Sequence, residues 1–401
     1  MATASALRVA IAGGSIGGLT AAVLLRDLGA DVHVFERSAT ELQGRGAGIV
    51  VHELSVRYLV ENRIADIDAL SVASHRHIHV DVSGATIHDD PIAYRYTSWN
   101  TLYRNLLRSL GPDRYHFGRA VTGFHDTGRE VVAATAGGGE IACDLLICAD
   151  GAASTGRAIL QPHVQPSYAG YVGWRGTVPE NVLSPSACSA LEDTLLYHWT
   201  GSSHILAYMI PGTDGEVRAG HRLVNFVWYR NVTEMELPDL MTDISGVEHS
   251  LSQPPGLVRE PHLHELRLAA QSLPPVLAEL VLAAPEPFIQ KIVDVEVDSM
   301  AFGRLCLLGD AAFTARPHTA AGTAKAAADA WALAEKLRTH GDVSAALTDW
   351  ESMQLRVGRQ LVARARELGE RSQFRAGWRA DDPYQRFGLM APGDSRITPG
   401  G

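Results

Sequence analysis

The chain has 401 residues, of which 46% are hydrophobic, and a formal net charge of −10 at pH 7. This length and hydrophobic content support a globular protein with a substantial core, built as two domains or as one domain with an insertion. The acidic balance and the lack of a basic block argue against nucleic-acid binding, because neutralising phosphates requires surplus Lys and Arg. No stretch reaches membrane-spanning length without charges, so we expect no membrane partner.

The N-terminal segment has the pattern of a strand, a glycine-rich turn, a helix and a second strand. A buried strand is predicted over Leu7–Ala12, a helix over Ser15–Leu28 and a strand over Asp31–Phe35. Four glycines between positions 13 and 18, without a strong basic region before them, fit this unit better than a signal peptide.

Such a turn lets backbone amides approach a pyrophosphate, whose charge the helix N-terminus stabilises. Ser15 stands where the usual pattern has its second glycine, and its small side chain can donate a hydrogen bond. A carboxylate at the end of the second strand can accept ribose hydroxyls. Taken alone, the turn leaves NAD, FAD and a purely structural unit open. The predicted cofactor contacts here are Gly13, Ser15, Ile16, Gly17, Glu36 and Arg37.

Further along, residues 119–148 predict hairpin strands around Thr135–Gly139. Apolar strands at Leu145–Ala149 and Arg304–Leu308 lead into two polar loops, Asp150–Arg157 and Gly309–Asp310. The β-branched and aromatic segments Tyr168–Val178, Leu195–Pro211 and Val224–Val232 predict an inserted sheet. Two helices are predicted near the C-terminal end, at 320–338 and 345–370, and residues after Phe374 are expected to be irregular.

Three of these segments together resemble the para-hydroxybenzoate hydroxylase family. They are the turn at 13–18, Asp150-Gly151-x-x-Ser154-x-x-Arg157, and Gly309-Asp310-Ala-Ala followed by Pro317. The resemblance covers nearly the whole chain. It is strongest to members that hydroxylate hydroxypyridines, through Tyr168–Gly176, Ala207–Gly212 and Arg316–Gly322.

The resemblance implies an α/β fold, with a Rossmann-type FAD-binding domain, an inserted β-sheet substrate domain and C-terminal helices. The expected ranges are 1–72, 98–166 and 291–374 for the first domain, 73–97 and 167–290 for the second, and 375–401 for an irregular tail. It also implies FAD as cofactor and NADH or NADPH as co-substrate. Asp310 would bind the FAD ribitol, and the implied cofactor contacts are Asp150, Arg157, Gly309, Asp310, Pro317, Ala320, Ala321 and Gly322.

A helix that begins near Ala320 would direct its positive end at the flavin and stabilise the anionic reduced form. Three positions depart from the family pattern. Trp99 stands where many members have Arg, Phe313 where His is common, and Ala324 where Asn is common. These departures affect pyrophosphate neutralisation and the redox setting of the flavin.

The implied reaction is NAD(P)H- and O₂-dependent hydroxylation of a hydroxypyridine or phenolic ring through a flavin C4a-hydroperoxide, in catabolism or in biosynthesis. Alternatives are a flavin oxidase or halogenase on the same fold, a noncatalytic FAD-binding protein, and a simple NAD dehydrogenase. The Asp150 and Asp310 segments disfavour the dehydrogenase.

The chemistry requires a base and a dry cavity. His204 and Tyr208 are four apart on one predicted strand, so they share a face. With His52, they resemble polar residues that contact the ring in a hydroxypyridine-acid hydroxylase, and all three are candidate catalytic residues. His204 and Tyr208 could equally serve only as hydrogen-bonding residues within a sheet, and His52 could serve only in a loop or as a helix cap. The candidate substrate contacts are Tyr171, Asn225, Trp228, Pro317 and His318.

His75, His77 and His79 alternate along one strand face with Asp81, but neighbours on one strand do not by themselves close a tetrahedral site, so we expect no metal. The four cysteines show no CxxC spacing, which favours a reduced cytoplasmic protein. The apolar stripe of the last helix fits packing on its own domain or on a second subunit, which leaves a homo-oligomer open.

Overall fold

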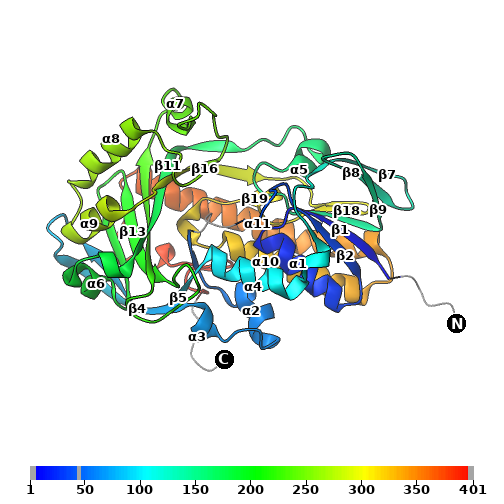
Figure 1. Cartoon of the computed structure of the whole chain (residues 1–401), viewed down its shortest axis with the longest axis horizontal. Helices are drawn as coiled ribbons and strands as arrows, with labels where there is room; N and C mark the ends of the chain where they lie inside the picture. Colours follow the sequence, from blue (N-terminus) through cyan, green and yellow to red (C-terminus); the bar gives the residue numbers. More distant parts are fainter. Residues whose placement is uncertain (1–5, 43–46, 396–401) are drawn as a thin grey trace.

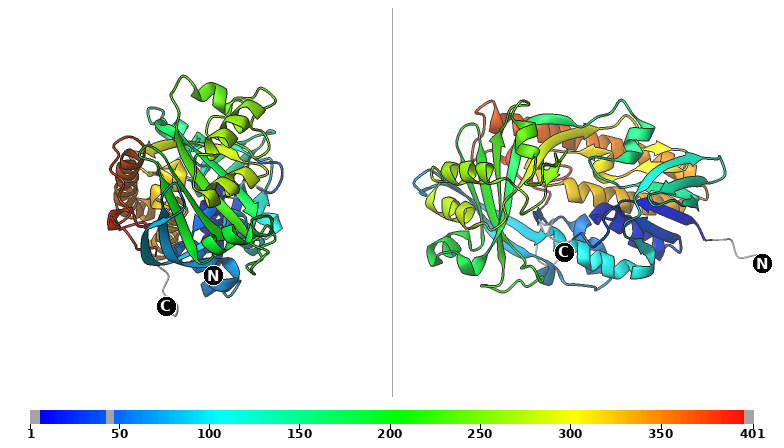
Figure 2. Two further views of the ribbon diagram at one scale, coloured as in Figure 1. Left: turned by 90° about the vertical axis from the view of Figure 1, so that its left-hand side faces the viewer. Right: turned by 45° about the horizontal axis from the view of Figure 1, so that its top comes forward.

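The computed structural model describes residues 6–42 and 47–395, and they form an elongated α/β molecule (Figure 1). A parallel sheet lies at one end and a larger, mainly antiparallel sheet at the other (Figures 1 and 2). Two long helices follow, of which α10 (Gly322–Thr339) packs against α1 and α11 (Val343–Gln373) lies along both parts. The fold is the predicted α/β arrangement with a second sheet. No helix in the described ranges is long and apolar enough to cross a lipid bilayer.

The first sheet has the strand order β17-β18-β10-β1-β2-β6 and is parallel except at β17. Its central strands are apolar on both faces, as buried parallel strands must be. Their carboxyl ends meet at one edge and deliver the Gly13, Asp150 and Gly309 loops to it. All four predicted strands of this sheet are confirmed to within one residue at each end. The bounds are β1 (Arg8–Ala12), β2 (Asp31–Phe35), β6 (Tyr115–His116), β10 (Leu145–Cys148), β17 (Ala301–Phe302) and β18 (Leu305–Leu307).

Several helices and a small sheet surround this part. The small sheet confirms the hairpin strands predicted within residues 119–148. The helices are α1 (Ile16–Asp27), α2 (Glu53–Glu61), α3 (Ile67–Leu70), α4 (Trp99–Leu110) and α5 (Thr155–Leu160). The small sheet contains β7 (Val121–Asp126), β8 (Val131–Thr135) and β9 (Glu140–Cys143).

The large sheet has the order β15-β16-β11-β14-β13-β12-β4-β5-β3, with β19 paired to β16. The strand-like segment 195–211 forms two antiparallel strands joined by a turn, and the second of them carries His204 and Tyr208 as predicted. The sheet also takes in β3 and the end of β16, beyond the ranges expected for the substrate domain, and the domain division itself stays a prediction. Its strands are β3 (Gly48–Val50), β4 (Val72–Val80), β5 (Thr86–Ser98), β11 (Ser167–Pro179), β12 (Thr194–Trp199), β13 (His204–Ile210), β14 (Leu223–Asn231), β15 (Ser252–Gln253), β16 (Phe288–Glu296) and β19 (Phe313–Thr314).

The two faces of the large sheet serve different purposes. One face packs into an apolar core with the outer helices, and that core includes Trp174, Phe226 and Trp228. The opposite face carries Tyr208 and Tyr229 toward the rest of the molecule. The outer helices are α6 (Pro185–Leu191), α7 (Leu237–Met241), α8 (Glu260–Ala270) and α9 (Pro275–Ala283) (Figure 1). Period-two alternation therefore decides which side chains reach the interior.

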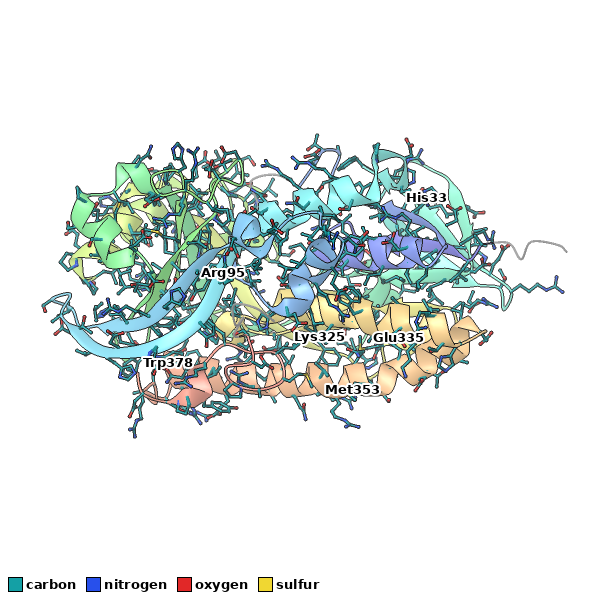
Figure 3. All side chains as sticks on the ribbon, turned by 90° about the horizontal axis from the view of Figure 1, so that it is seen from below. His33, Arg95, Lys325, Glu335, Met353 and Trp378 are labelled. Atoms are coloured by element: carbon teal, nitrogen blue, oxygen red, sulfur yellow. The ribbon has the colours of Figure 1, made fainter. Side chains whose placement is uncertain are left out.

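Residues 374–395, here called the C-terminal segment, are irregular as predicted, apart from one turn of 3₁₀ helix at Pro383–Gln385. They nevertheless pack closely, and Trp378 and Phe387 are buried. The Arg364 guanidinium of α11 donates hydrogen bonds to the carbonyls of Gly388, Tyr384 and Arg386. Figure 3 shows Trp378 beside the long strands β4 and β5. The segment is part of the folded core.

Candidate active site

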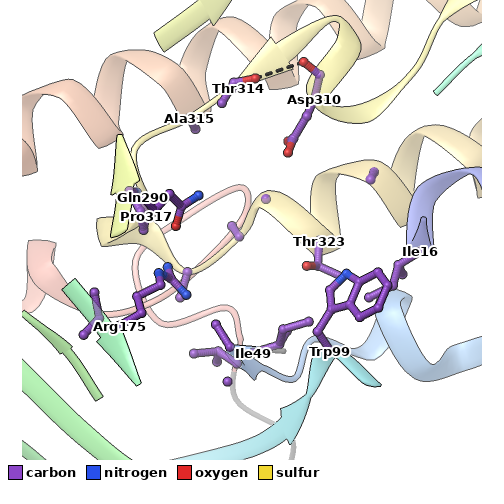
Figure 4. A pocket seen from close by; sticks show the side chains of 18 of the residues that line it. Ile16, Ile49, Trp99, Arg175, Gln290, Asp310, Thr314, Ala315, Pro317 and Thr323 are labelled. Atoms are coloured by element: carbon purple, nitrogen blue, oxygen red, sulfur yellow. Dashed lines mark hydrogen bonds between the residues drawn. The ribbon is translucent and has the colours of Figure 1, made fainter. Parts of the chain in front are cut away.

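A cavity of about 420 Å³ lies between the carboxyl edge of the parallel sheet and the inner face of the large sheet (Figure 4). Its wall combines the N-terminal turn, the Gly309–Asp310 loop, the loop at 317–323 and strands β3, β11, β13 and β14. The structure therefore brings the three separate sequence motifs to one place. Predicted site residues that line it are Ser15, Ile16, Gly17, Tyr208, Gly309, Asp310, Pro317, His318, Ala320, Ala321 and Gly322.

The N-terminal turn requires glycine for steric reasons. Gly13 has φ +97°, and a Cβ there would meet the Ala149 carbonyl oxygen at 2.3 Å. A Cβ on Gly18 would meet the Gly13 carbonyl oxygen at 2.0 Å. Ser15 is the N-cap residue of α1, but its side chain caps no backbone amide and lies at the cavity wall. The first amides of α1 are thus available to an anionic group.

Glu36 is buried beneath the turn and does not line the cavity. One carboxylate oxygen accepts a hydrogen bond from Gly14 N at 2.9 Å, and the other accepts one from Ser38 N at 2.9 Å. Arg37, beside it, is exposed. The carboxylate thus orients the turn, and the ribose contact expected of Glu36 and Arg37 stays a prediction.

The Asp150 loop is bound tightly to the Gly309 loop. Asp150 accepts hydrogen bonds from the Ser154 hydroxyl and from Gly156 N at 3.1 Å. Arg157 is buried and donates to the Ala311 carbonyl at 3.0 Å. Arg157 therefore holds two cavity loops together, rather than reaching the cavity itself.

Asp310 is the one carboxylate among the described residues that line the cavity, and its side chain points into it (Figure 4). Asp310 is exposed to the cavity, but the surrounding protein raises its pKa to about 6, while the nearby Lys325 ammonium opposes this rise. A buried ion pair fixes the loop behind it. Lys325 Nζ lies 2.6 Å from Asp329, and Asp329 accepts a hydrogen bond from Gly309 N at 2.9 Å.

The loop before α10 presents unsatisfied polar groups. Ala320 adopts φ 54°, an uncommon conformation for alanine, and α10 begins at Gly322, two residues later than predicted. No side chain caps its first turn, so its N-terminal amides face the cavity as expected. His318 Nδ1 and Thr319 Oγ1 are buried without hydrogen-bond partners among the described residues. Together with the glycine turn and Asp310, these groups fit FAD.

The inner face of the large sheet supplies a group of rings. His204 and Tyr208 share this face as predicted, but Tyr208 lines the cavity, whereas His204 lies behind the wall. The His204 ring is 4.7 Å from that of Tyr229 and 5.3 Å from that of His318. The Tyr171 hydroxyl lies 2.6 Å from His318 Nε2, and the roles predicted for these residues remain untested predictions.

Burial sets the protonation of these groups. It lowers the pKa of His204 to about 3 and that of His318 well below its usual value. It raises the pKa of Tyr229 to about 12 and that of Tyr208 further. Both imidazoles and both phenols are therefore neutral at pH 7, and they act as hydrogen-bonding groups rather than as charges.

Three predicted substrate residues have other partners. Asn225 accepts a hydrogen bond from Gly48 N at 2.7 Å, so its side chain holds strand β3 at the cavity wall. Trp228 faces the opposite side of the sheet and donates to the Ser203 hydroxyl, contrary to the expected aromatic wall. His52 lies behind the 317–323 loop, near the Ala320 carbonyl, and burial lowers its pKa to about 4. Contrary to expectation, His52 neither lines the cavity nor has the pKa of a base poised near pH 7.

Several cavity residues were not among the predicted contacts, and Arg175 and Gln290 are two of them. Arg175 lies on β11, four residues after Tyr171, so the alternation of that strand would have placed both on the inner face. Gln290 lies on the neighbouring strand β16, opposite Gly173, and has no comparable sequence signal.

The alternating histidines do not gather round one point. His75 is exposed and pairs with Asp193, whereas His77 and His79 are buried against Tyr197. Within residues 6–42 and 47–395, no group of three His, Cys, Asp or Glu side chains is placed to hold a metal ion.

Comparison with known proteins places these motifs in context. Two family descriptions match the chain: "FAD binding domain" over residues 289–365 and "FAD binding domain-like" over residues 168–294. 2,6-Dihydroxypyridine 3-monooxygenase of Paenarthrobacter nicotinovorans is 37% identical over 384 residues, which cover 95% of this chain and 96% of that protein. 6-Hydroxynicotinate 3-monooxygenase of Pseudomonas fluorescens is 28% identical and covers 83% of each chain.

A solved structure agrees with the sequence comparison. The 2,6-dihydroxypyridine-3-hydroxylase of Arthrobacter nicotinovorans superposes with a TM-score of 0.92 at 36% identity, over 97% of this chain and 98% of that one. A salicylate hydroxylase in complex with its substrate shares the fold, with a TM-score of 0.72 at 19% identity.

Proposed function

Because the chain belongs to the family of FAD-dependent aromatic monooxygenases, we propose that its ring substrate is a hydroxypyridine, hydroxylated with NADH or NADPH and O₂. The observation that carries the proposal is that one cavity joins the cofactor motifs to a wall of neutral rings. A relative that acts on 2,6-dihydroxypyridine matches nearly the entire chain. An oxidase, a halogenase or a noncatalytic protein is less consistent with these relatives.

Bound FAD supplies the oxygen chemistry, and the protein groups position both partners. The amides at the start of α1 and α10 would hold the anionic parts of the cofactor. The Asp310 carboxylate would accept hydrogen bonds from cofactor hydroxyls. The Asn225–Gly48 hydrogen bond holds β3 along the ring-binding side.

Tyr208 is the protein group best placed to contact the ring directly. Its hydroxyl stays protonated and can donate a hydrogen bond to a ring oxygen. Two neutral histidines pack against Tyr229. His204 lies behind the wall of the cavity, and His318 lies on the loop before α10. Because both imidazoles are neutral near pH 7, each has one nitrogen that donates a hydrogen bond and one that accepts, and the accepting nitrogen can orient a hydroxyl.

The test is oxidation of NADH and NADPH by FAD-loaded protein, with and without a panel of hydroxypyridines, pyridones and phenols. We expect a hydroxypyridine to stimulate O₂-dependent oxidation and to gain the mass of one oxygen atom. Stimulation by phenols alone would refute the choice of substrate. Stimulation by no ring would favour a larger biosynthetic substrate, an oxidase or a noncatalytic flavoprotein.

The cellular location of the protein is also a proposal. We propose a cytoplasmic location, supported by four free cysteines, of which three are buried. A homo-oligomer remains open, and light scattering of the purified protein would decide it.

A further inference from the structure

We propose that Arg175 is the anion-recognising residue of the ring cavity, so that the substrate binds as an anion, through an ionised ring oxygen or a carboxylate. This inference rests on the proposed function, because it concerns the charge of the ring substrate that binds in the same cavity. It adds a specificity-determining residue that the sequence motifs did not identify.

The position of Arg175 separates it from the cofactor motifs. It lies on β11, whose inner face it shares with Tyr171, and it lines the cavity. In Figure 4, Arg175 and Gln290 lie at one end of the cavity, whereas Ile16 and Trp99 lie at the other. A ring placed against Tyr208 and Tyr229 would therefore meet the guanidinium.

Arg175 is the one lysine or arginine among the described residues that line the cavity. It forms no salt bridge within the part of the chain that the structure describes, and its Nε is buried without a hydrogen-bond partner there. Tyr229 is its neighbour, and the guanidinium opposes the burial that raises the pKa of the Tyr229 hydroxyl. A half-buried charge without a counter-ion has donors to spare, and an anionic ligand would accept from them.

Arg175 is half-buried, whereas four arginines of the described residues are fully buried and have partners. Arg222 lies 2.7 Å from Glu180, and Arg316 lies 3.1 Å from Asp294. Arg157 and Arg364 donate to backbone carbonyls instead. Arg175 differs from all four, because its donors face an open cavity.

The groups around Arg175 do not neutralise it. Tyr208 and Tyr229 stay protonated, because burial raises the pKa of both, and His318 stays neutral. Asp310, the acidic group of the cavity wall, belongs to the cofactor motifs. A planar guanidinium can pair with a carboxylate through two hydrogen bonds, or with a ring oxyanion through one, while the Gln290 amide adds a neutral donor.

The test measures equilibrium binding to FAD-loaded protein through changes in flavin absorbance. The ligands are benzoate and benzamide, single rings that differ in charge, together with 2,6-dihydroxypyridine. We expect the wild type to bind benzoate more tightly than benzamide. Arg175→Gln should weaken benzoate binding at least about 10-fold and leave benzamide binding within about 2-fold, whereas Arg175→Lys should retain part of the preference.

Arg230→Gln is the matched control. Arg230 lies on the neighbouring strand β14 but stacks over Trp228 on the opposite face, so its removal should leave both affinities unchanged. FAD affinity is measured in parallel, because a loss of FAD binding in Arg175→Gln would assign the guanidinium to the cofactor and overturn the inference. A wild type that does not favour benzoate would also overturn it.

The two proposals fail separately. If the wild type hydroxylates a hydroxypyridine and Arg175→Gln binds it and benzoate normally, the inference about charge alone is wrong. If no hydroxypyridine reacts but benzoate binding still depends on Arg175, the choice of substrate alone is wrong.

Discussion

The indole of Trp378 stacks on the imidazole of His204, with ring centroids 5.1 Å apart and 18° between the planes. One ring comes from the irregular C-terminal segment and the other from a central strand of the large sheet. A segment expected to be irregular therefore packs behind a predicted catalytic residue.

Trp378→Ala is expected to lower the free energy of unfolding by about 3 kcal/mol, because it removes a large buried ring. Thermal or denaturant unfolding measures this. Trp378→Ala should also lower the yield of hydroxylated product per NADH, because the His204 ring loses the indole that stacks on it. Met390→Ala in the same segment is the control, because Met390 is 56% exposed and should change stability by less than about 0.5 kcal/mol. Equal effects of both variants would contradict a specific role of the stack.

Tyr208→Phe and His204→Asn are each expected to reduce substrate affinity or product yield per NADH by about 10-fold. The first removes a hydroxyl from the cavity wall, and the second removes the ring that packs behind this wall. FAD content should be unchanged. His198→Asn is the control, since His198 lies on the same sheet and contacts the Val80 carbonyl at 2.8 Å. Normal coupling in both variants would move the ring to another part of the cavity.

The pH dependence of product yield should not follow His204. Burial lowers the pKa of this imidazole to about 3, so it stays neutral from pH 5 to pH 9. We therefore expect His204→Asn to lower the yield by the same factor at every pH in that range. An inflection near pH 6.5 that disappears in this variant would show that His204 titrates in the working enzyme.

Asp310 should give the FAD-free protein a distinct pH dependence of stability. Its pKa in the folded state is about 6, above the ordinary 3.8, so folding favours its protonated form. Its contribution to stability is therefore present below about pH 4 and lost as the pH rises through 6. In Asp310→Asn this decline of the melting temperature should disappear, and FAD affinity should fall. The exposed Asp113→Asn should retain the decline.

Gly48→Ala should distort the ring-binding wall. A Cβ at this position would meet Tyr208 Cε2 at 2.6 Å and Asn225 Cγ at 2.8 Å. Overpacking of this kind costs about 1 to 3 kcal/mol, and ring affinity should fall with stability. Gly341→Ala is the control, because nothing lies within 4 Å of its added Cβ. An unchanged melting temperature in Gly48→Ala would mean that β3 moves away freely.

Local sequence signals predicted much of the fold. The glycine turn and the apolar parallel strands are fixed by backbone sterics and by burial on both faces, and both are visible within a few residues. The cavity residues Gly17, Asp310 and Gly322 follow from those elements, because strand ends and helix starts have a definite place in such a sheet.

The contacts that could not be predicted from the sequence mostly join residues far apart in the chain. The hydrogen bond from Gly48 to Asn225 and the stack of Trp378 on His204 join segments more than 170 residues apart, and no periodicity signals such pairs. Trp228 is different, because it lies three residues from Asn225, so strand alternation already placed the two on opposite faces.

The C-terminal segment also determines when the cavity is complete. Phe387 forms part of its wall, and Gly388 N donates to the Thr319 carbonyl at 3.1 Å, next to His318. The opposite wall begins with Ser15, so the enclosure joins residues separated by almost the whole described sequence. Because synthesis runs from the N-terminus, the glycine turn is made long before the segment that completes the cavity wall. The ring side of the cavity is therefore assembled only after this last segment has packed.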